Sequence, residues 1–279
     1  TPKPAPVQPT AVVSDKSIRA IPASAGVAIG PLFQFQPVKI TVDDTVGDPA
    51  TEKARLHKAI TVARTELTEV HQQVTQRIGP EEAAIFEAHL EILDDPDLLD
   101  AAVTNINGGK NAGQGWLAAV ETNADTLAQL QDELLAARAV DIRDVGNRVL
   151  RVLNGSTQTG PTLPDEPVIL IATDLTPSDT VTLDPNKVLG FCTATGGANG
   201  HTAILARALG LPAIVGAGDT VLTLANGTPI ILNGDTGTLA IDPDEAMLAK
   251  AKNIQQEHKT RTAAELADQQ VATAIAVEV

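Results

Sequence analysis

A single histidine stands between a glycine-rich turn and an apolar helical segment in TGGANGHTAILARALGLPAIVG, residues 195–216. The imidazole of His201 is a nucleophile near neutral pH, because its free pKa of about 6.5 leaves much of it unprotonated. Gly196, Gly197 and Gly200 let backbone N–H groups approach an anion. The following helix offers N–H groups at the positive end of its dipole. This pattern predicts a phosphoryl group carried on His201.

Three polar side chains near His201 extend the predicted pocket. Asn199 and Thr202 can hydrogen-bond a phosphate, and Arg207 lies two helical turns further along. We therefore predict a phosphate pocket formed by Gly196, Gly197, Asn199, Gly200, Thr202 and Arg207. The alternative that the local sequence leaves open is a histidine that only caps a helix in a tight turn.

Short strands and helices alternate around this site, which indicates an α/β domain. Thr176, Pro177 and Asp179 have the order of an N-cap, a first-turn proline and a capping-box acid, so a helix is expected there. An NGD turn predicts a hairpin at the end of the domain. The predicted elements are strands at 167–172, 187–194 and 212–217, helices at 175–183 and 201–209, and a hairpin at 228–243.

Residues 48–153 read as a helical unit. Asp48 followed by Pro49 predicts a helix start, and proline begins two further helices at Pro80 and Pro96. Helical sequence resumes from 112 to 153, as two helices meeting near 131–133. A strand at 27–35, preceded by a loop from residue 18, would be isolated unless it joins the later sheet. We therefore predict one α/β domain interrupted by a helical bundle.

The predicted domains follow from these changes in pattern. Residues 1–18 form a Pro-rich interdomain linker, which suggests a piece of a longer chain. We expect the α/β domain at 19–47 plus 154–243, the helical domain at 48–153, and a linker helix leading into VATAIAVEV, the first strand of a further domain, at 244–279.

Composition excludes several classes of protein. The net charge of −15 argues against nucleic acid and anionic membrane surfaces as partners. No signal peptide or membrane-spanning segment is expected, and the single Cys192 fits a reducing cytoplasm. No Walker or GxGxxG motif, nucleophile elbow or metal-ligand spacing is present, so we predict no metal site.

The segment GGANGHTAILARALGLPAIVG resembles the active-site signature of the PEP-utilising phosphohistidine domain, which Enzyme I of the bacterial phosphotransferase system shares with the dikinases. IPASAGVAIGP near the start, AAIFEAHLEILDDPDL at 83–98 and ARAVDIRDVGNRVLRVLNG at 137–155 resemble Enzyme I in the same order. The resemblance implies an α/β phosphohistidine (swivelling) domain interrupted by an all-α helical-bundle insertion, with a C-terminal linker helix. The dikinases lack this insertion, which disfavours a dikinase-like central domain.

The resemblance also implies residue roles. His201 matches the histidine that receives phosphate from a PEP-binding domain and passes it to the phosphocarrier protein HPr. Thr180 matches a threonine that hydrogen-bonds this imidazole. The HPr-binding face is expected at His89, Leu93, Leu98 and Arg138, and a basic patch on HPr would suit Glu81, Glu82, Glu87, Glu91, Asp94, Asp95 and Asp97.

This chain departs from the family pattern at two places. Glu82 stands where some members have a lysine that pairs with the phosphohistidine, so the compensating cation is unassigned. Asn199-Gly200 replaces a Thr-Ser pair, which removes a hydroxyl from the pocket. The family's barrel, which binds PEP and Mg²⁺, is expected to be absent, and Cys192 does not match its catalytic cysteine. We therefore expect no cofactor here and no use of PEP by this chain alone.

The predicted function is phosphoryl transfer of Enzyme I type to and from HPr, within a multiphosphoryl transfer fusion protein of the sugar phosphotransferase system. The alternatives are a phosphotransferase subunit of a dihydroxyacetone kinase and a non-catalytic HPr-docking module. The sequence does not identify the terminal sugar or other acceptor.

Overall fold

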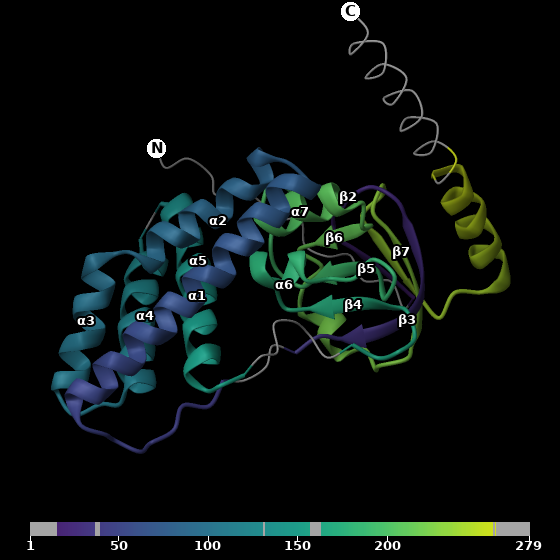
Figure 1. The fold of residues 1–279 in the computed structure, drawn as a ribbon. Coiled ribbons are helices and arrows are strands. Elements are labelled where there is room, and N and C mark those ends of the chain that lie inside the picture. Colours follow the sequence, from purple (N-terminus) through teal and green to yellow (C-terminus); the bar gives the residue numbers. More distant parts are fainter. Residues whose placement is uncertain (1–15, 37–39, 131, 157–162, 259, 261–279) are drawn as a thin grey trace, which may run out of the picture. The chain divides into compact units, whose positions relative to one another are not determined.

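The computed structural model describes residues 16–36, 40–130, 132–156, 163–258 and 260, which fall into two compact units (Figure 1). The sheet unit contains the described residues within 1–35, 163–175 and 183–279. The helical unit contains those within 36–162 and 176–182. The predicted linker before residue 16 and the predicted strand VATAIAVEV lie outside the described residues.

The helices of the helical unit begin where the sequence places capping residues. The Asp48 carboxylate accepts hydrogen bonds from the N–H groups of Ala50 and Thr51, both at 3.1 Å, and Asp95 accepts from Asp97 at 2.8 Å. These side chains satisfy amides that have no partner inside a helix, which confirms the predicted starts. The helices are α1 (Pro49–Arg77), α2 (Pro80–Leu93), α3 (Pro96–Asn107), α4 (Ala112–Ala128), α5 (Glu133–Leu153) and the short α6 (Pro177–Val181).

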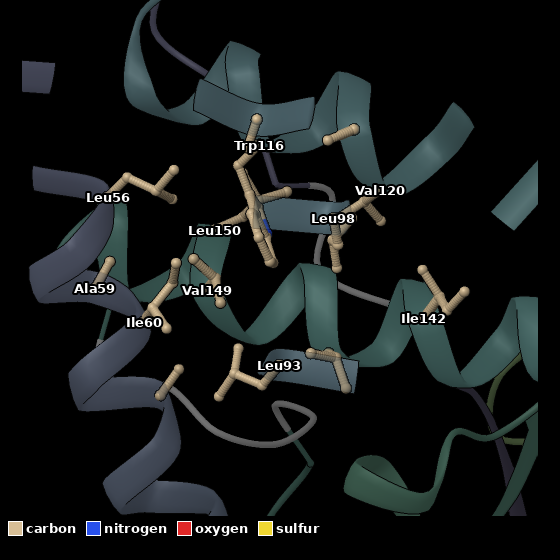
Figure 2. Close-up of a cluster of buried hydrophobic side chains, with 14 of the residues drawn as sticks. Leu56, Ala59, Ile60, Leu93, Leu98, Trp116, Val120, Ile142, Val149 and Leu150 are labelled. Carbon is tan, nitrogen blue, oxygen red and sulfur yellow. The ribbon is translucent and has the colours of Figure 1, made fainter. Parts of the chain in front are cut away.

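Trp116 belongs to the helical core (Figure 2). It is fully buried, and its indole Nε1 donates a hydrogen bond to the Gly146 carbonyl at 3.0 Å. The core also contains Leu56 and Ile60 of α1 and Val149 of α5 (Figure 2). Burial of these aliphatic and aromatic side chains is the main force that holds the helices together.

The described residues of the sheet unit form an eight-stranded sheet in the order β1-β8-β7-β3-β4-β5-β6-β2. Neighbouring strands from β3 to β6 are parallel, and the remaining pairs are antiparallel. The strands are β1 (Ser17–Arg19), β2 (Ile21–Ser24), β3 (Val27–Gln34), β4 (Val168–Ala172), β5 (Val188–Thr193), β6 (Ala213–Val215), β7 (Pro229–Asn233) and β8 (Thr238–Ile241). Strands β3 and β4 are parallel neighbours, with Leu32 opposite Ile169, although α1–α5 separate them in the chain.

Both faces of this sheet are apolar. Alternate residues of β4 belong to different core clusters, with Leu170 in one and Ile169 and Ile171 in the other, because successive side chains of a strand point to opposite faces. Helix α7 (His201–Leu209) contributes Ala203 and Ala206 to the first cluster. The 3₁₀ helix η1 (Asp219–Thr223) contributes to the second, and a helix over residues 245–258 packs on a third, smaller cluster.

Two expectations about these elements are wrong. The predicted loop from residue 18 contains the short strands β1 and β2, which pair with β8 and β6. Pro22 and Ala23 of β2 have weak strand preference, and pairing with distant strands stabilises both segments. Residues 176–182 and the described residues within 36–47 and 154–162, all predicted to belong to the α/β domain, group with the helical unit. For 176–182 the reason is that α6 is hydrogen-bonded to α5, as described below.

Candidate functional site

His201 is the first residue of α7 and is exposed. Gly200 occupies the N-cap with φ −69° and ψ 159°, and no side chain caps the helix. The Gly200 carbonyl accepts the N–H groups of Ala203 at 3.0 Å and Ile204 at 3.1 Å. The loop before His201 follows β5, so the histidine lies beyond the carboxyl end of a parallel strand. Ligands of open α/β sheets bind at this edge, where helix N-termini supply N–H groups to anions.

Backbone hydrogen bonds to neighbouring strands hold the start of this loop. The Thr195 N–H donates to the Thr173 carbonyl after β4 at 3.0 Å, and its Oγ1 donates to the same carbonyl at 2.9 Å. The Gly216 N–H, directly after β6, donates to the Thr195 carbonyl at 3.1 Å. Thr195 is not among the predicted site residues. Its position two residues after β5, at the carboxyl end of a parallel strand, is the signal that points to it.

The glycines of the loop differ in what they require. Gly196 has φ +95°, a conformation that residues with a Cβ rarely adopt. A Cβ at Gly197 would meet no atom within 4 Å, and a Cβ at Gly200 would lie 3.3 Å from the Gly197 carbonyl oxygen. Of these three positions, only residue 196 has a backbone conformation that requires glycine. All three, like Asn199, are exposed, and their role as a phosphate pocket stays a prediction.

Thr202 and Arg207, both predicted to contact phosphate, make other contacts in the structure. Thr202 Oγ1 donates a hydrogen bond to the Leu175 carbonyl at 2.8 Å. A hydroxyl has one proton, so Thr202 cannot donate to a phosphate while this bond exists. Arg207 Nη1 donates to the carbonyls of Ala23 at 2.7 Å and Ala198 at 3.2 Å. Both side chains therefore position the loop and the start of α7.

Thr180 belongs to α6 in the helical unit, whereas His201 belongs to the sheet unit. The Thr180 side chain is buried, and its Oγ1 donates to the Thr176 carbonyl at 2.9 Å. The Thr176 hydroxyl and the Asp179 carboxylate form the predicted capping box around the same turn. The hydroxyl proton is used in this bond, so Thr180 Oγ1 can act toward a further group only as an acceptor.

The structure does not place the predicted HPr-binding residues on one surface. Leu93 and Leu98 are 0% and 2% exposed and belong to the helical core, and His89 is 1% exposed. A partner cannot contact these side chains without unfolding the core, so their assignment to a binding face is wrong for this structure. Arg138 is exposed, and its Nη1 lies 3.6 Å from Asp141 Oδ2.

His89 belongs instead to a buried polar cluster between α2 and α5. Its Nε2 lies 3.5 Å from Asp141 Oδ1 and its Nδ1 lies 3.9 Å from Asp144 Oδ2. Arg148, one turn after Asp144, is also buried, and burial lowers the pKa of its guanidinium while Asp144 opposes this shift. Burial, reinforced by the charge of Asp144, raises the pKa of Asp179 on α6.

Metal and thiol chemistry receive no support from the described residues. Among them, no group of three or more His, Cys, Asp or Glu side chains is arranged to hold a metal ion. Cys192 lies in the sheet core, and burial raises the pKa of its thiol far above the usual range. In the part of the chain that the structure describes, no helix is long and apolar enough to cross a membrane.

Two family models match the chain. One is the N-terminal domain of PEP-utilising enzymes, over residues 19–138, and the other is the mobile domain of PEP-utilising enzymes, over residues 164–237. The first covers β2, β3, α1–α4 and the beginning of α5, and the second covers the loop with His201.

Curated relatives carry related names. A multiphosphoryl transfer protein of Rhodobacter capsulatus is 44% identical over 238 residues, which are 85% of this chain and 29% of the relative. A phosphoenolpyruvate-protein phosphotransferase of Geobacillus stearothermophilus is 36% identical over 253 residues, which are 90% of this chain and 44% of the relative. The chain thus spans less than half the length of these relatives.

Solved structures agree with these matches. A solution structure of the Enzyme I protein nEIt is 35% identical with a TM-score of 0.63, covering 86% of this chain and 99% of that one. An N-terminal domain of Enzyme 1 – Nitrogen is 30% identical with a TM-score of 0.56, covering 84% and 98%. The chain therefore belongs to the PEP-utilising enzymes and is an N-terminal region of the Enzyme I type.

Proposed function

We propose that this chain is a phosphoryl-transfer module that carries phosphate on His201 between a PEP-binding domain and the histidine of HPr. The observation that carries this proposal is the position of His201 at the start of α7, without a side-chain cap and beyond the carboxyl end of a parallel strand. The helix amides and the left-handed turn at Gly196 suit an anion that His201 holds.

The proposed reaction is an in-line displacement at phosphorus. The lone pair of His201 Nε2 attacks the phosphorus of phosphorylated HPr. The new N–P bond forms as the N–P bond on the carrier breaks, and the reverse transfer follows the same path. Little charge is created or lost, so positioning and electrostatic stabilisation supply most of the rate.

Thr180 would fix the tautomer of His201 in this reaction. Its own hydroxyl proton is engaged with the Thr176 carbonyl, so its oxygen is an acceptor. An acceptor at Nδ1 favours the tautomer with the proton on Nδ1 and leaves Nε2 unprotonated for attack. The architecture we propose is a swivelling α/β phosphohistidine domain interrupted by a helical bundle, with α6 belonging to the bundle.

The HPr contact would use exposed charges, because the predicted leucines are buried. Arg138 is exposed, and six acidic residues on or near α2 are exposed and suited to a basic patch, namely Glu81, Glu87, Glu91, Asp94, Asp95 and Asp97. The matches to multiphosphoryl transfer proteins of Rhodobacter capsulatus and Xanthomonas campestris support a fusion protein as the parent. We assign the module to sugar transport in the cytoplasm, with PEP and Mg²⁺ bound only by the separate PEP-binding domain.

Incubation of the chain with phosphorylated HPr tests this function. The expected result is a mass gain of one phosphoryl group that is labile in acid and stable in alkali. His201→Ala should abolish the gain, and the exposed His57→Ala should leave it unchanged. A parent chain that binds HPr without gaining phosphate would instead be a docking module. Label retained by His201→Ala would refute the site.

A further inference from the structure

Ser178 of helix α6 makes two hydrogen bonds to α5. The Ser178 N–H donates to Asp144 Oδ2 at 3.1 Å, and its Oγ accepts a hydrogen bond from Arg148 Nη2 at 2.9 Å. Asp144 and Arg148 are four residues apart on α5, so they lie on one face of that helix. Together they bind the backbone N–H and the hydroxyl of the same serine.

The two α5 side chains are themselves held in place. Arg148 Nη1 lies 3.4 Å from Glu66 Oε2 on α1, and its side chain is 6% exposed. Asp144 is 6% exposed and lies near the His89 imidazole. Buried charges of this kind contribute little net stability compared with apolar packing. Here their hydrogen bonds to Ser178 link α6 to α5.

A helix as short as α6 cannot hold its own orientation. It spans Pro177–Val181, barely more than one turn, and isolated helices of this length are unstable in water. Its capping box and the hydrogen bond from Thr180 to Thr176 make the turn internally regular. The hydrogen bonds of Ser178, together with the packing of Val181 against the cluster that contains Phe86, therefore fix where Thr180 points.

We propose that Asp144 and Arg148 are positioning residues for phosphoryl transfer, acting through Ser178 on the orientation of Thr180. This inference rests on the proposed function of His201 and Thr180. It makes Thr180 a part of the helical unit, although the chain enters and leaves α6 from β4 and β5 of the sheet unit.

A double-mutant cycle in the whole chain tests whether Ser178 and Arg148 act through the same contact. We expect Ser178→Ala and Arg148→Met each to lower the single-turnover rate from saturating phosphorylated HPr by about tenfold. The double variant should fall by no more than about tenfold, because both changes break the same contact. The HPr concentration for half-maximal rate should stay unchanged. Ser178→Thr, which keeps the hydroxyl, should restore the rate.

The matched control is Arg143→Met, an arginine of α5 that pairs with Glu121 and Asp125 and does not contact α6. It should transfer phosphate at the parent rate. Circular dichroism checks that each variant is folded. If Arg148→Met is unfolded, Arg148→Lys replaces it in the cycle with Ser178→Ala.

A second readout is the His201 tautomer, followed by ¹⁵N NMR of labelled histidine. Ser178→Ala and Arg148→Met should shift the His201 ring signals in the direction seen for Thr180→Val, whereas Arg143→Met should not. If the folded variants transfer phosphate at the parent rate with unchanged ring signals, the inference is overturned and the proposed function is not affected. The same holds if the losses of rate in Ser178→Ala and Arg148→Met are fully additive in the double variant. A parent chain that accepts no phosphoryl group would overturn both.

Discussion

The guanidinium of Arg207 donates a hydrogen bond to the backbone carbonyl of Ala198 at 3.2 Å. Arg207 lies in the last turn of α7, and Ala198 lies in the loop that leads into the same helix. The same Nη1 donates to the Ala23 carbonyl at 2.7 Å, which extends the contact to β2. The helix that begins with His201 therefore also restrains the loop that precedes it.

This contact predicts the effect of removing the arginine. Arg207→Met should speed amide hydrogen exchange in residues 196–200 and lower the free energy of unfolding of the sheet unit by about 1–3 kcal/mol, the usual cost of a lost hydrogen bond to a charged group. Arg207→Lys, which can still donate to one carbonyl, should give a smaller effect. Unchanged exchange in Arg207→Met would contradict the loop-holding role.

Gly200 can accept a side chain. Its φ of −69° and ψ of 159° are typical of an N-cap that residues with a Cβ adopt readily, and serine is a better N-cap than glycine. Gly200→Ser should raise the free energy of unfolding by about a few tenths of a kcal/mol, which is the usual difference between serine and glycine at an N-cap. Thermal unfolding provides the measurement. Gly196→Ser, at φ +95°, is the contrasting variant and should destabilise the fold by at least about 1 kcal/mol.

Asp174, two residues after β4 and three residues before α6, predicts a pH dependence. Burial raises the pKa of its carboxyl, against a hydrogen bond from the Leu175 N–H. The native state therefore holds this proton more tightly than the unfolded chain. The stability that this preference gives is complete below the ordinary pKa of about 3.9 and is lost as the pH rises through the raised value.

Asp174→Asn is neutral at every pH, and its amide oxygen can still accept from Leu175. The free energy of unfolding of this variant, relative to the parent, should therefore increase from pH 4 to pH 7. Urea denaturation at several pH values measures the difference. A difference that stays constant or decreases over this range would show that burial does not control this carboxyl.

Gly146 is packed against Val120 where α4 and α5 cross. A Cβ at Gly146 would lie 2.5 Å from Val120 Cγ1, so alanine cannot fit without displacement. Overpacking costs about 1–3 kcal/mol, and the better helix propensity of alanine offsets about 1 kcal/mol. Gly146→Ala should therefore lower the free energy of unfolding by up to about 2 kcal/mol. In a Val120→Ala background the same change should become neutral or stabilising.

Leu93 and Arg138 separate core packing from partner binding. Leu93→Ala should lower the free energy of unfolding by about 2–5 kcal/mol and leave HPr affinity unchanged at temperatures where the variant is folded. Arg138→Glu should weaken HPr binding several-fold, because it replaces the guanidinium proposed to donate hydrogen bonds to HPr by a carboxylate, and should leave the free energy of unfolding within about 0.5 kcal/mol of the parent. Titration calorimetry measures both affinities, and Arg143→Glu is the charge-matched control. Equal losses for Arg138→Glu and Arg143→Glu would remove Arg138 from the binding face.

The sequence by itself determined the helices, most strands and the position of His201. Asp48-Pro49 and Thr176-Pro177 act locally, because a capping oxygen and a proline satisfy or remove amides within the same turn. The change from the glycine-rich turn to the helix also depends on neighbouring residues only, and α7 begins at His201 as predicted. Residue spacing is sufficient evidence for features of this kind.

Tertiary structure alone decided which side chains are exposed and which unit α6 joins. Leu93 has the same local pattern whether it faces a partner or a core, and only packing against the other helices buries it. Ser178 meets Arg148 of a distant segment, and Thr202 and Arg207 donate to carbonyls outside their own helix. These contacts join residues far apart in the chain, so no local spacing predicts them.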